Sequence, residues 1–131
     1  MTINTSVSAR DRSTVERYIA AMQAGPSGVD DLVGLFEDDA VYVEPFMGQP
    51  QTHSGKAEIR EFFQHALSTN MNGARLTLDR LDIDGGRLRW EWTCVIPAFS
   101  APLRGFDLLT LRDGRIVRLE TTVTEFPPMQ Q

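Results

Sequence analysis

The feature that most constrains the fold is a strict alternation between positions 88 and 96. Every second residue is apolar, and the residues between them are charged or polar as far as Thr93. The apolar set is Leu88, Trp90, Trp92, Cys94 and Ile96, and the polar set is Arg89, Glu91 and Thr93. A period of two is that of a strand with one buried and one solvated face, as in antiparallel sheets. The chain is therefore expected to contain a sheet that is covered on one side.

Turn signals divide the second half of the chain into further strands. Asp84-Gly85-Gly86 and Asp113-Gly114 both have hairpin composition, because Asp and Gly tolerate the positive φ angles of tight connections. The second turn predicts a hairpin between strands 104–111 and 116–126. Before the first turn the apolar alternation changes phase, which predicts a β-bulge near Arg80. These strands are expected to form one antiparallel sheet.

The first half of the chain has the 3.6-residue period of amphipathic helices. Three helices are predicted, at 9–24, 27–36 and 56–67. Gly25-Pro26 ends the first, Ser27 with Asp30 resembles a capping box for the second, and Ser54 is expected to cap the third. Helices that precede the strands, rather than alternating with them, indicate an α+β fold.

The segment between the second and third helices carries the first candidate for chemistry. It is expected to contain an acidic solvated turn at 37–39, a short strand at 41–44 and a loop at 46–53. Pro45 cannot donate to a strand ladder, so Glu44 is expected at a strand end. Its neighbours are apolar, which places an ionisable group at the edge of apolar material.

Length and composition predict one globular domain at 9–126, a flexible N-terminal arm at 1–8 and a C-terminal tail at 127–131. The net charge of −5, with 13 scattered Lys and Arg residues, argues against nucleic acid and anionic membranes as partners. No apolar run approaches the roughly 18 residues of a membrane span.

Cysteine and histidine usage bounds the remaining chemistry. Cys94 is the single cysteine, which excludes an intrachain disulfide and suits a reducing compartment. The polar residues 1–12 contain no secretory leader, so a cytoplasmic location is expected. His53 and His65 are too few and too far apart in sequence for a metal site, and no metal is expected.

Four segments together resemble the cone-shaped NTF2-like superfamily and, within it, ketosteroid isomerases (steroid delta-isomerases) and SnoaL-like cyclases. They are Val15–Met22, Leu35–Ala40, Glu44-Pro45 and Gly55–Phe63. The resemblance extends over about residues 13–126. It implies three N-terminal helices packed on a strongly curved antiparallel sheet around an apolar pocket, no cofactor, and a homodimer. The superfold carries many unrelated functions.

In ketosteroid isomerases a carboxylate at the end of the strand after the second helix carries a proton. A tyrosine on the first helix and a protonated aspartic acid on a late strand hold the oxyanion. By resemblance these positions are Glu44, where the family usually has aspartate, Tyr18 and Asp107. The expected apolar lining for a small ring-containing ligand is Met22, Phe36, Phe62, Trp92 and Leu119.

Two departures from the isomerase pattern, and one from that of a related hydrolase, bear on activity. The extra methylene of Glu44 would displace its carboxylate by about 1 Å, which can cost on the order of 100-fold in rate. Phe63 stands where isomerases often carry a tyrosine that supports the oxyanion tyrosine. Gly105 stands where a related epoxide hydrolase would have arginine, which disfavours a hydrolase.

The function hypotheses therefore remain open. A ketosteroid-isomerase-like enzyme would move a proton on a cyclic enone or ketone through an enolate, with Glu44 as base and Tyr18 and Asp107 as donors. A SnoaL-type cyclase would need one carboxylate, and a non-catalytic ligand-binding dimer would need only the pocket. Tyr18 and Trp92 would also fit an inert core. Asp107 has apolar neighbours in both directions, so burial is expected whichever way it points, and a buried carboxyl without a role is costly.

Overall fold

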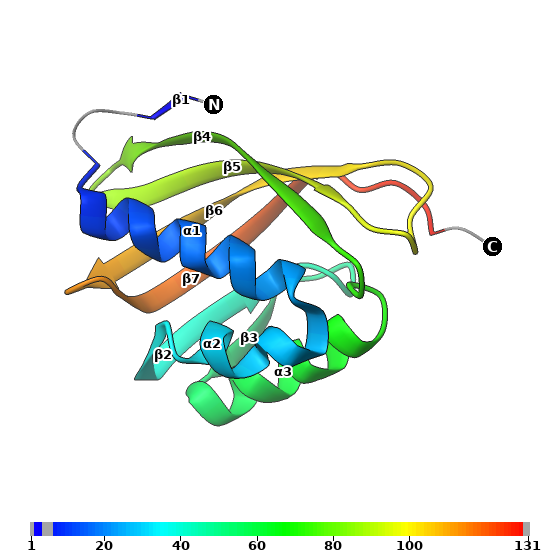
Figure 1. Cartoon of the computed structure of the whole chain (residues 1–131), viewed down its shortest axis with the longest axis horizontal. Coiled ribbons are helices and arrows are strands. Elements are labelled where there is room, and N and C mark those ends of the chain that lie inside the picture. Colours follow the sequence, from blue (N-terminus) through cyan, green and yellow to red (C-terminus); the bar gives the residue numbers. More distant parts are fainter. Residues whose placement is uncertain (1, 4–6, 130–131) are drawn as a thin grey trace.

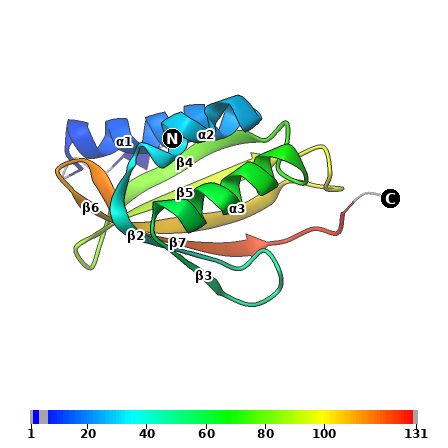
Figure 2. The ribbon, with the colours of Figure 1, turned by 90° about the horizontal axis from the view of Figure 1, so that it is seen from below.

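A computed structural model describes residues 2–3 and 7–129. The helices are α1 (Ala9–Gln23), the 3-10 turn η1 (Gly25–Gly28), α2 (Val29–Val33) and α3 (Lys56–Ser68). The strands are β1 (Thr2–Ile3), β2 (Phe36–Glu44), β3 (Gln51–Ser54), β4 (Arg75–Asp84), β5 (Arg87–Val95), β6 (Leu103–Arg112) and β7 (Arg115–Glu125). The helices lie along one face of a curved sheet (Figures 1 and 2). Parts of the expected N-terminal arm and C-terminal tail, residues 1, 4–6 and 130–131, lie outside the described residues.

The sheet is mixed, with the strand order β1-β4-β5-β6-β7-β2-β3. Strands β4 to β7 are consecutive antiparallel neighbours, and the predicted hairpin turns join β4 to β5 and β6 to β7. The predicted bulge is confirmed as a register shift between Leu78 and Arg80. The expected α+β arrangement of N-terminal helices on a curved sheet is confirmed, but the sheet is not antiparallel throughout, because β2 runs parallel to β7 and β1 parallel to β4. Strand β2 comes from the helical half of the chain and lies beside the last strand, β7.

The region between the first and third helices differs from the sequence expectation. The second helix ends at Val33, and β2 already begins at Phe36, a fully buried residue paired with Ile116 of β7. The acidic residues 37–39 belong to β2 and not to a turn. Their pairing with β7 is interrupted, so their side chains reach solvent, and Asp38 lies 3.5 Å from the Lys56 ammonium.

The expected helix caps and loop also need correction. The Ser27 hydroxyl donates to the carbonyl of Ala24 and caps no helix. Gly55, and not Ser54, is the N-cap residue of α3, with a φ of 87°. The Ser54 amide instead donates to the Glu58 carboxylate. The expected loop 46–53 includes the first part of β3, which pairs with β2 at the sheet edge. These residues are polar, so nothing in their hydropathy indicates a strand.

An aromatic cluster joins the helices to the concave face of the sheet. Tyr18 of α1 meets the rings of Phe63 and Trp90 edge-on, with centroids 6.4 and 5.9 Å away. Tyr42 of β2 stacks on Phe63 at 5.2 Å with an interplanar angle of 16°. Large aromatic side chains bury much apolar area, so this cluster fixes α1 and α3 over the same part of the sheet.

Candidate functional site

A cavity of about 40 Å³ lies between α1 and the concave face of the sheet. Its lining residues are Tyr18, Met22, Tyr42, Phe46, Met71, Ala74, Leu76, Trp90, Trp92, Cys94, Ile96, Leu103, Asp107 and Thr121. A water molecule needs roughly 10–15 Å³ of such space, so the cavity has room for a few waters. A ring-shaped ligand would have to displace lining side chains in order to enter.

Asp107 is the carboxyl group of this cavity. It lies on β6, directly between Trp90 of β5 and Thr121 of β7, and is 2% exposed. The indole Nε1–H of Trp92 donates to its Oδ1 over 3.1 Å. Burial raises the pKa of Asp107 from 3.8 to about 7, although hydrogen bonding to Trp92, Thr121 and Trp90 lowers it in part. The group can therefore give or take a proton near neutral pH.

Tyr18 reaches the same cavity from α1. Its side chain is 5% exposed and forms part of the cavity wall. Burial raises the pKa of Tyr18 well above its ordinary value, and the charges of Tyr42 and Asp107 add to the effect. Tyr18 thus stays neutral and can donate a hydrogen bond to an oxygen in the cavity.

A second tyrosine, which sequence reasoning did not single out, extends this polar group. The Thr121 hydroxyl donates to the Tyr42 hydroxyl over 3.5 Å, and Thr121 stands opposite Asp107 on the neighbouring strand. Burial and the Asp107 charge raise the pKa of Tyr42 well above its ordinary value. Strand parity could have found this residue, because Tyr42 lies on the same side of β2 as Ala40 and Glu44.

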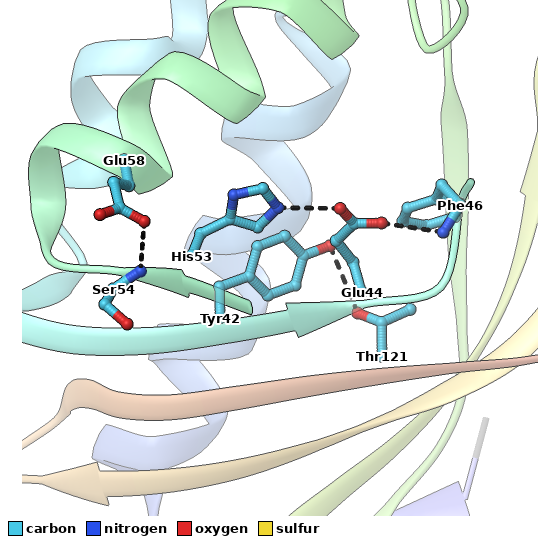
Figure 3. Close-up of polar contacts among 7 residues, drawn as sticks. All are labelled: Tyr42, Glu44, Phe46, His53, Ser54, Glu58 and Thr121. Atoms are coloured by element: carbon cyan, nitrogen blue, oxygen red, sulfur yellow. Dashed lines mark hydrogen bonds and ion pairs between the residues drawn. The ribbon is translucent and has the colours of Figure 1, made fainter. Parts of the chain in front are cut away.

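Glu44, the expected proton carrier, has a different setting (Figure 3). It is 1% exposed and is absent from the residues that line the cavity. One carboxylate oxygen accepts the Phe46 amide over 2.8 Å, and the other lies 2.8 Å from Nε2 of His53. The structure thus pairs His53, expected as a plain loop residue, with the buried carboxylate. Only the antiparallel β2–β3 pairing brings the two together.

The five expected lining residues separate into three groups. Met22 and Trp92 line the cavity. Phe36 and Leu119 are fully buried but belong to the surrounding core and not to the cavity wall. Phe62 lies outside the cavity, in a neighbouring apolar groove.

That outer groove measures about 370 Å³ and runs between α3, the loop after β2 and the C-terminal segment. Four residues line both it and the cavity, namely Phe46, Met71, Ile96 and Leu103. The segment that follows β7 closes one side, where the amide and hydroxyl of Ser100 both donate to the carbonyl of Pro128. The groove and the cavity are therefore adjacent compartments with a shared wall.

The described residues contain neither a metal-binding cluster nor a membrane-spanning helix. No group of three or more His, Cys, Asp or Glu side chains there could hold a metal ion. Among the same residues, no helix combines the length and the apolar character that crossing a bilayer would require.

The sequence matches the family model of the SnoaL-like domain over residues 15–119. The chain belongs to the SnoaL-like family. Its fold is that of NTF2-like proteins, including one of unknown function from Mesorhizobium loti (20% identity, TM-score 0.73, 95% of this chain and 100% of that chain covered).

Two further solved structures with this fold are of proteins with a suggested enzymatic activity. A candidate ketosteroid isomerase from Kribbella flavida is 20% identical, with a TM-score of 0.68 and coverage of 91% of this chain and 82% of that one. A candidate polyketide cyclase from Sinorhizobium meliloti is 23% identical, with a TM-score of 0.70 and coverage of 84% and 94%. Identities this low show the shared fold, and within this fold activity depends on the residues of the site.

Proposed function

We propose that this SnoaL-like protein is a ketosteroid-isomerase-like enzyme, which moves a proton on a small cyclic enone or ketone through an enolate. The observation that carries the proposal is the presence of Tyr18 and Asp107 in one apolar cavity. A neutral phenol and a carboxyl group that titrates near neutrality are the two components that enolisation needs.

In the proposed reaction the substrate carbonyl accepts a hydrogen bond from the Tyr18 hydroxyl. The Asp107 carboxylate removes the proton from the carbon next to the carbonyl, and negative charge moves to the oxygen. Asp107 then returns the proton to the far carbon of the shifted double bond, so that nothing is oxidised or reduced. The apolar surroundings strengthen the hydrogen bond to the developing oxyanion.

This scheme gives the proton to Asp107, whereas the family resemblance gives it to Glu44. Both oxygens of Glu44 are already engaged, and its side chain does not line the cavity. A base has to come within hydrogen-bond reach of the proton that it removes. Asp107 already lines the cavity, and we therefore prefer it as the base.

The test is the conversion of β,γ-unsaturated cyclic ketones to their conjugated isomers, followed by ultraviolet absorbance. 3-Cyclohexen-1-one and 5-androstene-3,17-dione sample a small and a large ring system. Asp107→Asn and Tyr18→Phe should each lower kcat by about 100-fold or more. Met22→Leu, an apolar exchange of similar volume in the same cavity, is the matched control. Conversion of both ketones no faster than in buffer would overturn the proposal.

A second candidate is a SnoaL-type polyketide cyclase, or a related lyase or hydrolase. The observation that favours it is that Asp107 is the one carboxylate among the described residues that line the cavity. A single acid–base group is sufficient for ring closure by proton transfer. Cyclisation of a polyketone substrate without isomerisation of either test ketone would support this candidate.

The third candidate is a ligand-binding protein without catalysis. Tight binding of a planar phenol, combined with no turnover, would support it. In each case the proposed partner is a small apolar ring-containing ligand, and the proposed assembly is a homodimer.

A further inference from the structure

The Glu44 carboxylate holds both ends of the loop that links β2 to β3 (Figure 3). Its Oε1 accepts the amide of Phe46 at the start of the loop, and its Oε2 is paired with His53 on β3, each over 2.8 Å. Within the loop, the Gly48 amide donates to the carbonyl of Pro45 over 3.0 Å. A single buried side chain therefore fixes where the loop leaves one strand and enters the next.

The loop matters because Phe46 forms part of the wall between the cavity and the outer groove. This side chain lines both compartments. Its ring is nearly parallel to that of Phe62 at 6.4 Å and meets Phe126 edge-on at 6.2 Å. Phe46 thus lies between α3 and the segment that follows β7, in the wall that the two compartments share.

Aromatic packing and burial hold the Glu44–His53 pair in place. Tyr42 stacks on the His53 ring at 6.0 Å, and Phe62 packs against it at 4.9 Å. Because Glu44 is almost fully buried, loss of either partner would leave a desolvated carboxylate oxygen without its hydrogen bond. The pair therefore resists movement of the loop while both contacts are intact.

We propose that Glu44 is a positioning residue, which with His53 holds Phe46 in place and so controls the passage of ligand between the outer groove and the inner cavity. The cavity of about 40 Å³ cannot admit a ring while Phe46 stays in place, whereas the groove of about 370 Å³ can. Displacement of Phe46 joins the two spaces. This inference rests on the proposed function only in taking the cavity as the ligand site.

The experiment measures how fast a fluorescent phenol, 2-naphthol, enters and leaves the full-length protein in stopped flow. Phe46→Ala removes the ring from the shared wall and His53→Ala removes a hydrogen bond to the carboxylate, so each should raise the dissociation rate about tenfold. His53→Gln should restore the wild-type rate, because its amide can still donate to Glu44. Gln49→Ala, an exposed change in the same loop, is the matched control and should stay within about twofold.

Glu44→Gln separates the positioning role from a role as base. If Glu44 positions Phe46, this variant should raise KM and the dissociation rate about tenfold while kcat changes less. In a Phe46→Ala background it should add no further increase, since the side chain that it positions is gone. If Glu44→Gln does not fold, the His53 and Phe46 variants decide the question alone.

Three outcomes would overturn the inference. One is a 100-fold loss of kcat in Glu44→Gln with wild-type exchange rates, which is the result for a base. The second is a further increase in the 2-naphthol dissociation rate when Glu44→Gln is added to Phe46→Ala. The third is failure of 2-naphthol to bind the wild-type chain. Absence of turnover with loop-dependent 2-naphthol exchange would instead remove the proposed reaction and leave this inference standing.

Discussion

The indole of Trp92 donates its Nε1–H to the carboxylate of Asp107 over 3.1 Å, from the neighbouring strand. This contact needs space, and Gly105, the residue opposite Trp92 on β6, provides it. A Cβ atom at Gly105 would lie 2.8 Å from Cζ2 of Trp92 and would overlap the carbonyl oxygen of Thr122. Glycine at this position therefore allows the indole to lie beside the carboxyl group whose pKa it adjusts.

Gly105→Ala should accordingly destabilise the protein. The added methyl group meets backbone that cannot move away cheaply, so a loss of about 1–3 kcal/mol in the free energy of unfolding is expected. Urea denaturation followed by tryptophan fluorescence measures the loss. Gly85→Ala is the control, because its φ of 59° is strained for alanine but nothing lies within 4 Å, so about 1 kcal/mol is expected. A loss at position 105 no larger than that at position 85 would contradict the packing explanation.

Trp92→Phe should raise the pKa of Asp107 above its value of about 7. The hydrogen bond from the indole favours the ionised carboxylate, and phenylalanine removes the donor while keeping an aromatic ring. Titration of the carboxyl carbon by NMR gives the pKa directly. Met22→Leu also changes the cavity wall but removes no hydrogen-bond donor, so it should leave the pKa of Asp107 unchanged. An unchanged or lower pKa in Trp92→Phe would show that the indole does not stabilise the carboxylate.

The free energy of unfolding should fall as pH rises, because Asp107 ionises. The pKa of Asp107 in the folded protein is raised above its ordinary value, so the folded state keeps a proton that the unfolded chain releases. The stabilisation is complete below about pH 4 and is lost as pH rises to about 7. A shift from 3.8 to about 7 corresponds to on the order of 4 kcal/mol in total.

Asp107→Asn tests this linkage. The amide keeps an oxygen that can accept from Trp92 but does not ionise, so the variant should exceed the wild type in stability at pH 8 and lose that advantage near pH 4. Denaturant titrations at both pH values measure the difference. An advantage that is the same at both pH values would point to packing and not to ionisation.

Local patterns predicted the elements whose side chains alternate clearly or whose turns have special chemistry. Strands β4 to β7, both Asp-Gly-containing turns and the bulge near Arg80 follow from such patterns. Burial of Asp107 also followed, because apolar residues stand on both sides of it along β6. The positions of Tyr18 and Asp107 were proposed from the family resemblance, and the structure brings both to one cavity.

Contacts between distant segments were harder to predict. The strand β3 is short, polar and at the sheet edge, so its hydropathy gave no signal. Pairing of His53 with Glu44 depends on that strand and was therefore missed. The acidic residues 37–39 suggested a turn because their charges are solvated, but solvated side chains occur equally well on an irregular strand.

Cys94 should resist alkylation in the folded protein. It lines the cavity wall, and burial raises the pKa of its thiol to about 12, so almost no thiolate forms near neutral pH. Mass spectrometry after exposure to iodoacetamide should find the native protein unmodified and the urea-unfolded chain modified at one site. Rapid modification under native conditions would mean that the thiol reaches solvent more readily than its burial indicates.

The homodimer remains a prediction that outer-face substitutions can test. Phe106 lies on β6 with its side chain on the face away from the helices, half-buried beneath the Arg89 guanidinium, which is 3.7 Å from the ring centroid. If a second copy covers this face, Phe106→Glu would place an extra charge at the interface and should weaken association by 10-fold or more. Sedimentation equilibrium over a range of concentrations measures it. Gln64→Glu adds the same charge on the exposed side of α3 and should leave association unchanged. A monomer at all concentrations, or a dimer indifferent to Phe106→Glu, would exclude the outer face of the sheet as the interface.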